Sequence, residues 1–570
     1  MNPDWLFRHF EQISQAPDAI PRLRRFIVDL AILGKLASRG LKEPTTVELL
    51  AQVQEEKRRL LKEGEMKRKK PQGPILEEEI PIQGASHVVF VRLAEIASIE
   101  RGTTGIQKAK PGEYPLVTLA EDRAFCDSYQ YDTKAVIIPL ISSTGHGHAS
   151  MKRLHYQEGK FAVGNILCAV IPYAPQLVSA RFLYEYFCAY REPLFVSKMI
   201  GTANVSLTIK NIGETPVPII SPRAQKQVDE LMGLCGELEV ARAKLERRRD
   251  RLVAATLHGL NNGDDSLEPG GHPTFEESAR FYFNHLPRLA TRPEHIQQLR
   301  QTILNLAVHG KIVQQRTEEG SGEELLCRLK ATHPENRKFG ASRGKGHSPL
   351  DQLDCPAIFP VPPTWRWAYL DFLCEQIADI DHNMPKTVAH GVPFISAKDL
   401  KDDGTIDFSN SKMISEDDYE RLSRKVQMRS GDIVYSRIGA RLGKARIVYV
   451  DTRFLISYSC CLVRPMHEFV DKHYLQRFLD SNLALNQAHK GAQSIGVPDL
   501  GLGEIKEFRI PLPPLAEQHR IVAKVDELMT LCNELEVRLT EGATTRHQFL
   551  EATLHEALTG HQELHQMAAL

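Results

Sequence analysis

Apolar residues recur along two stretches of the chain at the spacing of an amphipathic helix. The stretch 222–260 carries Val, Leu, Cys and Leu at i, i+3, i+7 and i+10 from Val228, and the stretch 515–570 repeats these four residues from Val525. This spacing places side chains on one face of an α-helix. One such stripe usually packs into an ordinary core. Two similar stripes in one chain favour two long helices that pack on each other as an antiparallel coiled coil.

The two helices belong to an internal duplication. The segment VDELMGLCGELE from Val228 returns 297 residues later as VDELMTLCNELE, and ATLH at Ala255 returns with the same offset. Nearer the start of each half, LRRFIVDLAILGKL from Leu23 resembles LRQTILNLAVHGKI from Leu299. Self-similarity of this kind indicates a chain built from two related halves.

Each half is rich in short strands between its matching helices. The first contains HVVFVRL, YPLVTL, AVIIPLI and FAVGNILCAVIP, and the second contains PTWRWAYLDFL, GDIVYSR, KARIVYV and FLISYSCCLVRP. These runs have the composition of strands. The two β-rich inserts share the order of their elements but little residue identity. Two similar helical surfaces suit two copies of one partner, and two dissimilar β-rich surfaces suit two different ligands.

These patterns predict an α+β fold with two β-rich domains separated by two long antiparallel coiled-coil helices, as a pseudo-twofold internal duplication. A linker between the halves is predicted from its opening, NNGDDSLEPGGHP. The predicted order is a helical region over 1–78, a β-rich domain over 79–221, a long helix over 222–260, the linker over 261–290, a helical region over 291–345, a second β-rich domain over 356–514 and a second long helix over 515–570.

Composition narrows the classes of function. No apolar run approaches the roughly 20 residues that span a bilayer, and the start MNPDWLFRHF lacks the layout of a signal peptide. The ten cysteines are scattered without a C-x-x-C pair, so neither a zinc site nor a disulfide framework is indicated. We therefore expect a cytoplasmic protein with reduced thiols and no membrane association.

The balance of charge bears on DNA binding. Lys and Arg together number 72, as do Asp and Glu, so the net charge is zero. Proteins that bind DNA alone through a large phosphate footprint are usually basic. A DNA-binding role would therefore need a partner that supplies most of the phosphate contacts.

Three segments resemble the specificity subunits of type I restriction-modification enzymes. They are PLPPLAEQHRIVAKVDELM at 511–529, PIISPRAQKQVDELM at 218–232, and FPVPPTWRW at the entry to the second β-rich domain. The resemblance extends over essentially the whole chain. One departure is that Val228 lies 6 positions after Pro222, whereas Val525 lies 11 positions after Pro514.

The resemblance implies that each β-rich domain is a target recognition domain that reads one half of a bipartite site in double-stranded DNA. It also implies that the coiled coil spaces the two domains and docks two adenine-methyltransferase (modification) subunits. S-adenosylmethionine, ATP and magnesium would be bound by these and by the restriction subunits, which translocate and cleave DNA. The chain itself is then expected to be a non-catalytic part of a restriction system, with no catalytic residue, cofactor or metal of its own.

Two other functions stay open. In PDLGLGEIK, the residues Asp499, Glu504 and Lys506 superficially match the metal carboxylates and catalytic lysine of an autonomous metal-dependent endonuclease. Such carboxylates must converge on one magnesium, yet here they share one Gly-rich turn and the first half keeps only Glu214. The other alternative is a coiled-coil scaffold whose β-rich domains bind protein.

Candidate DNA contacts are polar and basic residues on loops that could enter a groove. SSTGHGHASMKR follows an apolar strand in the first domain, and SRIGARLGKAR lies between two strands in the second. A third candidate is the turn after each late helix, GTANVS at 201–206 and GAQSIG at 491–496. The alternative for the second segment is a solvated basic hairpin. The candidate residues are Ser142, Ser143, Thr144, His146, His148, Lys152, Arg153, Asn204, Ser436, Arg437, Arg441, Lys444, Arg446, Gln493 and Ser494.

Overall fold

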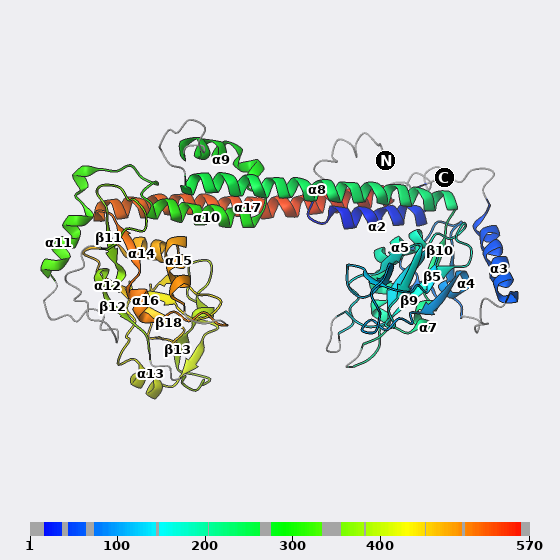
Figure 1. The fold of residues 1–570 in the computed structure, drawn as a ribbon, viewed down its shortest axis with the longest axis horizontal. Helices are drawn as coiled ribbons and strands as arrows, with labels where there is room; N and C mark the ends of the chain where they lie inside the picture. Colours follow the sequence, from blue (N-terminus) through cyan, green and yellow to red (C-terminus); the bar gives the residue numbers. More distant parts are fainter. Residues whose placement is uncertain are drawn as a thin grey trace, which may run out of the picture. The chain divides into compact units, whose positions relative to one another are not determined.

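A computed structural model describes the chain as two compact units (Figure 1). Unit 1 is Met1–Glu246 with Gly542–Leu570, and unit 2 is Arg247–Glu541. The structure describes residues 16–36, 44–63, 73–143, 148–202, 205–262, 275–332, 355–380, 384–450, 452–492 and 496–559. Within these ranges no helix is long and apolar enough to cross a membrane.

Two long helices are shared between the units. Helix α8 (Pro222–Asn262) begins in unit 1 and ends in unit 2, whereas α17 (Leu515–Thr559) begins in unit 2 and ends in unit 1. They correspond to the two helices predicted from the apolar stripes. Helix α8 begins at Pro222 and α17 at Leu515, at the positions where the sequence predicts the two helices to begin.

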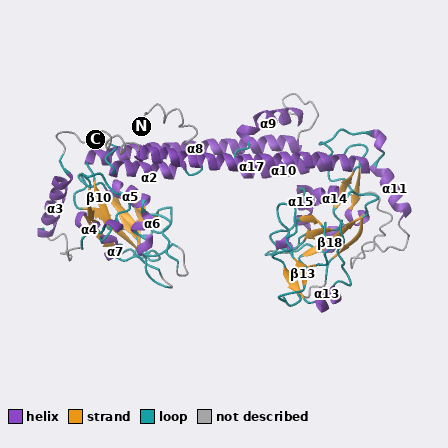
Figure 2. Cartoon of the chain, turned by 180° about the vertical axis from the view of Figure 1, so that it is seen from behind, coloured by secondary structure: helices purple, strands orange, loops and turns teal. Residues whose placement is uncertain are grey.

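Unit 1 contains α2 (Ala19–Ile32), α3 (Thr46–Lys62) and the first β-rich domain. The domain has one four-stranded sheet ordered β2-β9-β6-β7, a second ordered β4-β3-β8-β5, and the pair β1-β10. Figure 2 shows the strands of this domain in orange, with β10 labelled. Its strands are β1 (Val89–Arg92), β2 (Ala97–Arg101), β3 (Tyr114–Val117), β4 (Ala124–Cys126), β5 (Tyr131–Asp132), β6 (Ala135–Pro139), β7 (His155–Gln157), β8 (Lys160–Val163), β9 (Leu167–Pro172) and β10 (Pro216–Ile219). Its helices are α4 (Leu93–Ile96), α5 (Ala180–Ala189), α6 (Arg191–Leu194) and α7 (Ile209–Gly213).

Unit 2 contains α9 (Phe275–Leu289), α10 (Pro293–Val308), α11 (Gly322–Thr332) and the second β-rich domain. The sheets are ordered β12-β18-β15-β16, β14-β13-β17 and β11-β19. The strands are β11 (Arg366–Tyr369), β12 (Cys374–Ala378), β13 (Val392–Ile395), β14 (Lys412–Ile414), β15 (Ile433–Ser436), β16 (Ala445–Ile447), β17 (Leu455–Ile456), β18 (Cys460–Pro465) and β19 (Arg509–Leu512). The helices are α12 (Leu370–Leu373), α13 (Glu416–Leu422), α14 (Lys472–Leu479), α15 (Asn482–Gly491) and α16 (Leu502–Lys506).

The two β-rich domains share the strand order of their main four-stranded sheets and the register of the central strand pair, whereas the second sheet has four strands in the first domain and three in the second. The central pairing is antiparallel in both, with Val136 opposite Val170 in the first and Ile433 opposite Val463 in the second. Each domain also contains one parallel pair, β3 with β8 and β13 with β17. The α+β class and the internal duplication are therefore confirmed, although the sequences of the inserts differ.

A buried glutamine in the first turns of each long helix joins that helix to its β-rich domain. The Gln225 side chain accepts a hydrogen bond from Ser179 N at 2.7 Å and donates to Leu177 O at 2.8 Å. Gln518 likewise accepts from Asp471 N at 2.8 Å and donates to Phe469 O at 3.2 Å. Helices α5 and α14 begin at these points, packing between their sheets and α2 or α10 respectively.

An Asp–His pair joins the later part of each long helix to a shorter helix. The long helix supplies the histidine in unit 1 and the aspartate in unit 2. In unit 1, His547 on α17 lies 3.1 Å from Asp18, which directly precedes α2. In unit 2, Asp250 on α8 lies 3.0 Å from His295 on α10. His547 and Asp250 occupy equivalent positions in the repeat, so the acid and the base have exchanged places between the two halves.

The prediction of a linker over 261–290 is wrong for its second part, where α9 lies. Tyr282 on α9 is fully buried, and Leu289 packs in one core with Val253 and Leu257 of α8. The apolar residues of α9 are therefore part of the core of unit 2. The Gly- and Asp-rich opening of the segment suggested a linker for all of it, although its aromatic second part does not have linker composition.

Candidate nucleic-acid interface

In unit 1 the loop between β6 and β7, the first loop (140–154), is fastened to the turn that precedes α7. Leu140 O accepts a hydrogen bond from Leu207 N at 2.9 Å, and Ser142 N donates to Val205 O at 2.9 Å. Two of the segments selected from the sequence are thus brought together, although they lie far apart along the chain. Backbone hydrogen bonds of this kind fix the course of a loop whatever its side chains are.

Unit 2 repeats this arrangement in the second loop (437–444), between β15 and β16. Arg437 O accepts from Leu500 N at 3.0 Å, and Gly439 N donates to Pro498 O at 2.9 Å. Arg437 and Gly439 lie 297 positions after Leu140 and Ser142, and Leu500 and Pro498 lie 293 positions after Leu207 and Val205. The candidate loop and the candidate turn therefore meet at the same topological position in both domains.

Serine hydroxyls shape the first loop from within. Ser142 Oγ donates to His148 O at 2.6 Å and accepts from Ser150 N at 3.1 Å, while Ser143 Oγ accepts from Lys152 N at 2.9 Å. His148 and Lys152 are exposed. The two serines thus order the loop, and the imidazole and the ammonium group are presented to solvent.

Arg153 completes the cationic edge of the first loop. Its guanidinium lies 2.9 Å from the carboxylate of Glu121, a largely exposed residue. The backbone carbonyl of Lys152 accepts from Arg191 at 2.8 Å, which holds this edge against α6. An ion pair between exposed side chains contributes little stability, so the pair with Glu121 leaves Arg153 among the candidate contacts.

Arg437 does not point to solvent, contrary to the prediction that it contacts DNA. Its side chain is 4% exposed and lies 2.9 Å from Asp379 and 2.8 Å from Asp499, and it donates to Leu500 O at 3.0 Å. These acceptors engage the guanidinium inside the domain. Arg437 therefore stabilises the second loop and is removed from the candidate DNA contacts.

Arg446 and Ser436 are removed for the same reason. Arg446 is as buried as Arg437, donates to Lys401 O at 2.7 Å and lies 3.4 Å from Asp480. Burial raises the pKa of Asp480, and the nearby charge of Arg446 opposes this. Ser436 is fully buried, and its hydroxyl bonds to Arg441 O. All three belong to the interior of the domain.

Arg441 and Lys444 are partly exposed and remain candidates. Arg441 donates to Leu400 O at 2.7 Å, and the ammonium group of Lys444 bonds to Asp402, which lowers the pKa of that carboxyl group. The segment around Leu400 also brings Lys398 and Lys401 beside the second loop, with largely exposed side chains. These two lysines could not be selected from the sequence, because SAKDLKDDG mixes charges of both signs and lies beside the loop only in the folded domain.

The remaining five candidates lie outside the described residues. They are Thr144, His146, Asn204, Gln493 and Ser494. Lys152, Arg153, Arg441 and Lys444, together with His148, are thus the sequence-selected residues whose exposed position suits a DNA contact.

The residues of the endonuclease alternative do not act together. Asp499 is bonded to Arg437, and Lys506 lies 3.6 Å from Asp371. Across the described ranges, no group of three or more His, Cys, Asp or Glu residues is arranged to hold a metal ion. The turn therefore serves the second loop structurally, through Asp499.

The comparison with known families decides the identity. Residues 86–232 and 387–544 match the family "Type I restriction modification DNA specificity domain", and together they make up more than half of the chain. The chain belongs to this family. Each matched segment contains most of one β-rich domain and the beginning of the long helix that follows, so these domains are called recognition domains below. As a type I specificity protein the chain supplies DNA specificity and is not the catalytic subunit of its system.

Relatives are similar over nearly their whole length. The type I restriction enzyme EcoAI specificity subunit of Escherichia coli is 24% identical over 597 residues, which covers 95% of this chain and 94% of the relative. The EcoEI specificity subunit of the same organism is 23% identical over 598 residues, with the same coverage. Among solved structures, a chain of a type I R-M system is 16% identical, covers 84% of this chain and 99% of its own length, and has a TM-score of 0.47.

Proposed function

We propose that each recognition domain reads one half of a bipartite site in double-stranded DNA. The observation that supports this most is the pair of loops held by equivalent backbone hydrogen bonds but carrying different side chains. Sequence is read by side chains that reach base edges, whereas backbone and phosphate contacts fix orientation. Two loops with the same backbone hydrogen bonds but different side chains would suit two half-sites of different sequence.

The exposed cations are the proposed contacts. In the first domain these are Lys152 and Arg153 with His148 beside them, and in the second Arg441 and Lys444. Lys398 and Lys401 lie where they would meet the phosphate backbone next to the second loop. A cluster of this size neutralises only a few phosphates.

The remaining phosphate contacts would come from partner subunits, which agrees with the net charge of zero. We propose two methyltransferase subunits, which bind S-adenosylmethionine, and restriction subunits, which use ATP and magnesium. This chain would then contribute specificity and position, and its partners the chemistry.

The two long helices are the proposed spacer. With 41 residues in α8 and 45 in α17, each would be about 60 Å or more in length. They run in opposite directions with respect to the units, because α8 starts in unit 1 and α17 starts in unit 2. This supports an antiparallel coiled coil that sets the distance between the half-sites.

Exchange of one recognition domain tests the proposal. Residues 79–221 are replaced by the recognition domain of another specificity subunit, and the methylated sequence is determined across a genome in the presence of the methyltransferase. We expect one half-site to change and the gap to stay the same. A change in both half-sites would contradict the proposal that one domain reads one half-site.

A deletion in the two long helices tests the proposed spacer. Removal of four residues from both α8 and α17 should shorten the gap between the half-sites by about one or two base pairs. An unchanged gap would show that the helices do not set it.

A further inference from the structure

A polar groove of about 490 Å³ lies in unit 2 between the later part of α8, the helix α10 and the first residue of α15. Helices α10 and α15 are neighbours, so the groove lies where the helical layer of unit 2 meets the second recognition domain (Figure 1). Six of its lining side chains are amides, and we call these six residues the amide groove. They are Asn261, Gln297, Gln298, Gln301, Asn305 and Asn482.

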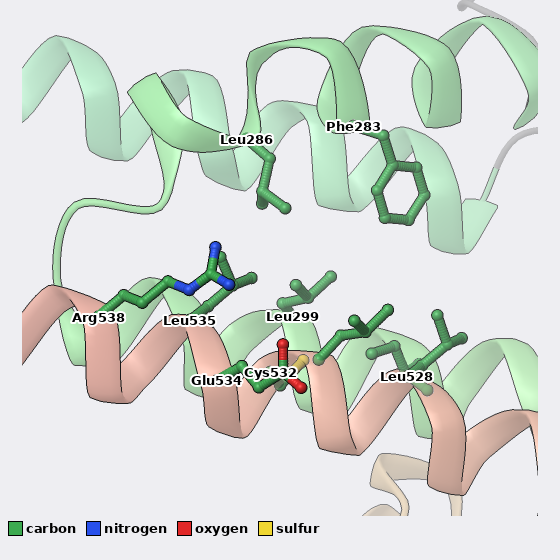
Figure 3. Close-up of a pocket in the computed structure, with 10 residues that line it drawn as sticks. Phe283, Leu286, Leu299, Leu528, Cys532, Glu534, Leu535 and Arg538 are labelled. Atoms are coloured by element: carbon green, nitrogen blue, oxygen red, sulfur yellow. The ribbon is translucent and has the colours of Figure 1, made fainter.

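Another pocket of unit 2 has the opposite chemistry. It has a volume of about 200 Å³ and lies between α9, α10 and α17, where Phe283 and Leu286 project from α9 towards α17 (Figure 3). Most of its lining side chains are apolar. An amide side chain, by contrast, both donates and accepts hydrogen bonds. The amide groove therefore suits a polar ligand, which the apolar pocket does not.

Two amides of the groove are not held by the fold. The side-chain oxygens of Asn261 and Gln301 are buried, and neither has a hydrogen-bond partner among the described residues. Buried polar atoms nearly always have such a partner. An amide group without one can turn and present either its oxygen or its nitrogen. Both residues are thus able to bond to a ligand in the groove.

The corresponding residues of unit 1 bond to one another instead. Asp29 on α2 corresponds to Asn305 on α10 in the repeat. Tyr190 corresponds to Asn482, because each lies 11 positions after the residue that caps α5 or α14. Tyr190 is 2% exposed, its hydroxyl donates to the carboxylate of Asp29, and the guanidinium of Arg25 lies 5.1 Å from the centre of its ring. The fold therefore accepts a large side chain at this place and does not itself require the groove of unit 2.

Helix α15 connects the amide groove to the second loop. Asn482 is the first residue of the helix and Gly491 the last. Leu485 packs against the second loop so closely that a Cβ added to Gly443 would lie 2.7 Å from Leu485 Cδ1. The groove and the loop are therefore separated by no more than the length of α15, about 15 Å for ten residues. This is the rise of about four base pairs of DNA.

We infer that the amide groove binds the sugar–phosphate backbone of DNA within about four base pairs of the second half-site. The inference rests on the proposed function, in which the second loop contacts that half-site. Asparagine and glutamine side chains bond to phosphate and sugar oxygens without reading sequence. Asn482 also lies at the end of α15 where the helix dipole favours an anion. The one carboxylate that lines the groove, Glu294, is exposed and opposes a phosphate.

Truncation of two amides tests the inference. The full chain is assembled with the methyltransferase of its own system and titrated with a duplex that carries its methylated bipartite sequence. Gln298→Ala combined with Gln301→Ala should weaken binding roughly tenfold, whatever base pairs adjoin the half-site. Because amides are neutral, the salt dependence of binding should stay the same. Asn284→Ala, which removes an exposed amide from α9, is the matched control and should bind as the unaltered chain does.

Neutral methylphosphonate linkages in the duplex locate the contact. They are introduced one at a time within four base pairs of the second half-site. At the contacted position, the linkage should weaken binding by the unaltered chain but should not weaken binding by the double variant any further. If the effects of the double variant and of every linkage simply add, the inference is wrong while the proposed function stands.

Two further changes alter the groove without removing its amides wholesale. Asn305→Asp with Asn482→Tyr copies the pair of unit 1, so it should close the groove and weaken binding while the unfolding temperature is kept. Gln298→Lys should strengthen binding and raise its salt dependence by about one ion. Ala255→Lys is the control for the added charge, since Ala255 is exposed on α8 and does not line the groove.

The complexes are also examined by native mass spectrometry. Every variant should retain the methyltransferase subunits that the unaltered chain binds. Their release by the Gln298→Ala and Gln301→Ala double variant would assign the amide groove to that subunit and overturn the inference. An unaltered complex that binds no bipartite duplex would overturn the proposed function as well.

Discussion

The two recognition domains place opposite chemistry at one backbone position. Leu140 and Arg437 accept the same backbone hydrogen bond at the base of their loops. Both side chains are buried, but one is an aliphatic group in an apolar core and the other a guanidinium between two aspartates. The backbone hydrogen bonds therefore set the course of the loop, and the buried side chain at its base differs between the domains without changing that course.

The strand that follows each loop also carries different buried side chains at one equivalent position. His155 on β7 and Arg446 on β16 occupy one register position, and both are buried. His155 contacts Arg123 at 3.1 Å, whereas Arg446 contacts the carboxylate of Asp480. A buried polar group is tolerated at this position as long as its own domain supplies a partner.

The loops also differ in length. Twelve residues separate Ser142 from His155, but only six separate Gly439 from Arg446. In the shorter loop Gly439 and Gly443 adopt φ values of 94° and 90°, a conformation that glycine adopts without a steric penalty. The shorter loop thus contains two glycines in this conformation and is anchored by the buried Arg437.

The largest difference is expected when the residue at the shared position is truncated. Arg437→Ala removes a buried guanidinium and leaves Asp379, whose side chain is 17% exposed, without this partner, and it should cost about 3–4 kcal/mol of unfolding free energy. Leu140→Ala removes only apolar contacts and should cost about 2–3 kcal/mol. Chemical denaturation of both variants measures this. If Arg437→Ala kept full stability and lost only DNA affinity, the guanidinium would read DNA, as its sequence context suggested.

Periodicity made the long helices and the duplication predictable. An apolar residue every three or four positions requires only local geometry, and the repeat from Val228 to Val525 identified the second helix independently. The meeting of each candidate loop with its candidate turn follows from the shared topology of the two halves. The helices and the duplication are evident from short stretches of sequence and from their repetition, whereas the contact between each loop and its turn comes from the structure.

The burial of Arg437 and Arg446 could not be predicted in this way. Their acceptors Asp379 and Asp480 lie 58 and 34 residues away along the chain, and a basic segment rich in glycine has the same composition whether it is exposed or buried. Helix α9 was missed because its polar, glycine-rich approach was read together with it as one linker. In each case the deciding contacts are long-range.

A pH dependence should distinguish the two domains at the position shared by His155 and Arg446. Burial lowers the pKa of His155 to about 4, and the charge of Arg123 acts in the same direction. The unfolded chain, with a histidine pKa near 6.5, then binds a proton that the folded domain does not. Stability should therefore fall as the pH is lowered from about 6.5 to about 4, by about 2–3 kcal/mol. The second domain carries an arginine, not an imidazole, at this position.

Denaturation at several pH values measures this effect, with His155→Gln as the control that should lose most of the slope. The first recognition domain is expected to respond and the second to be less affected. Equal slopes in the variant and the unaltered chain would show that another group titrates, and that the His155 imidazole gains its proton as readily when folded as when unfolded.

The smallest effects are expected from the exposed cations of the two loops, and they bear most directly on how the domains divide the DNA site. Lys152→Ala and Arg441→Ala should each weaken binding of the assembled complex by about 1 kcal/mol, or roughly fivefold. Because the two residues lie in different domains, their effects should add in the double variant. Binding is measured by titration of duplexes in which one half-site at a time has been replaced. If Arg441 reads a base in the second half-site, its truncation should weaken binding of the unaltered duplex and have little effect once that half-site is replaced. If Arg441 contacts a phosphate instead, its truncation should weaken binding of both duplexes and should lower the salt dependence of binding by about one ion. Loss of the Lys152 effect on replacing the half-site assigned to the second domain would mean that the two loops do not read separate halves.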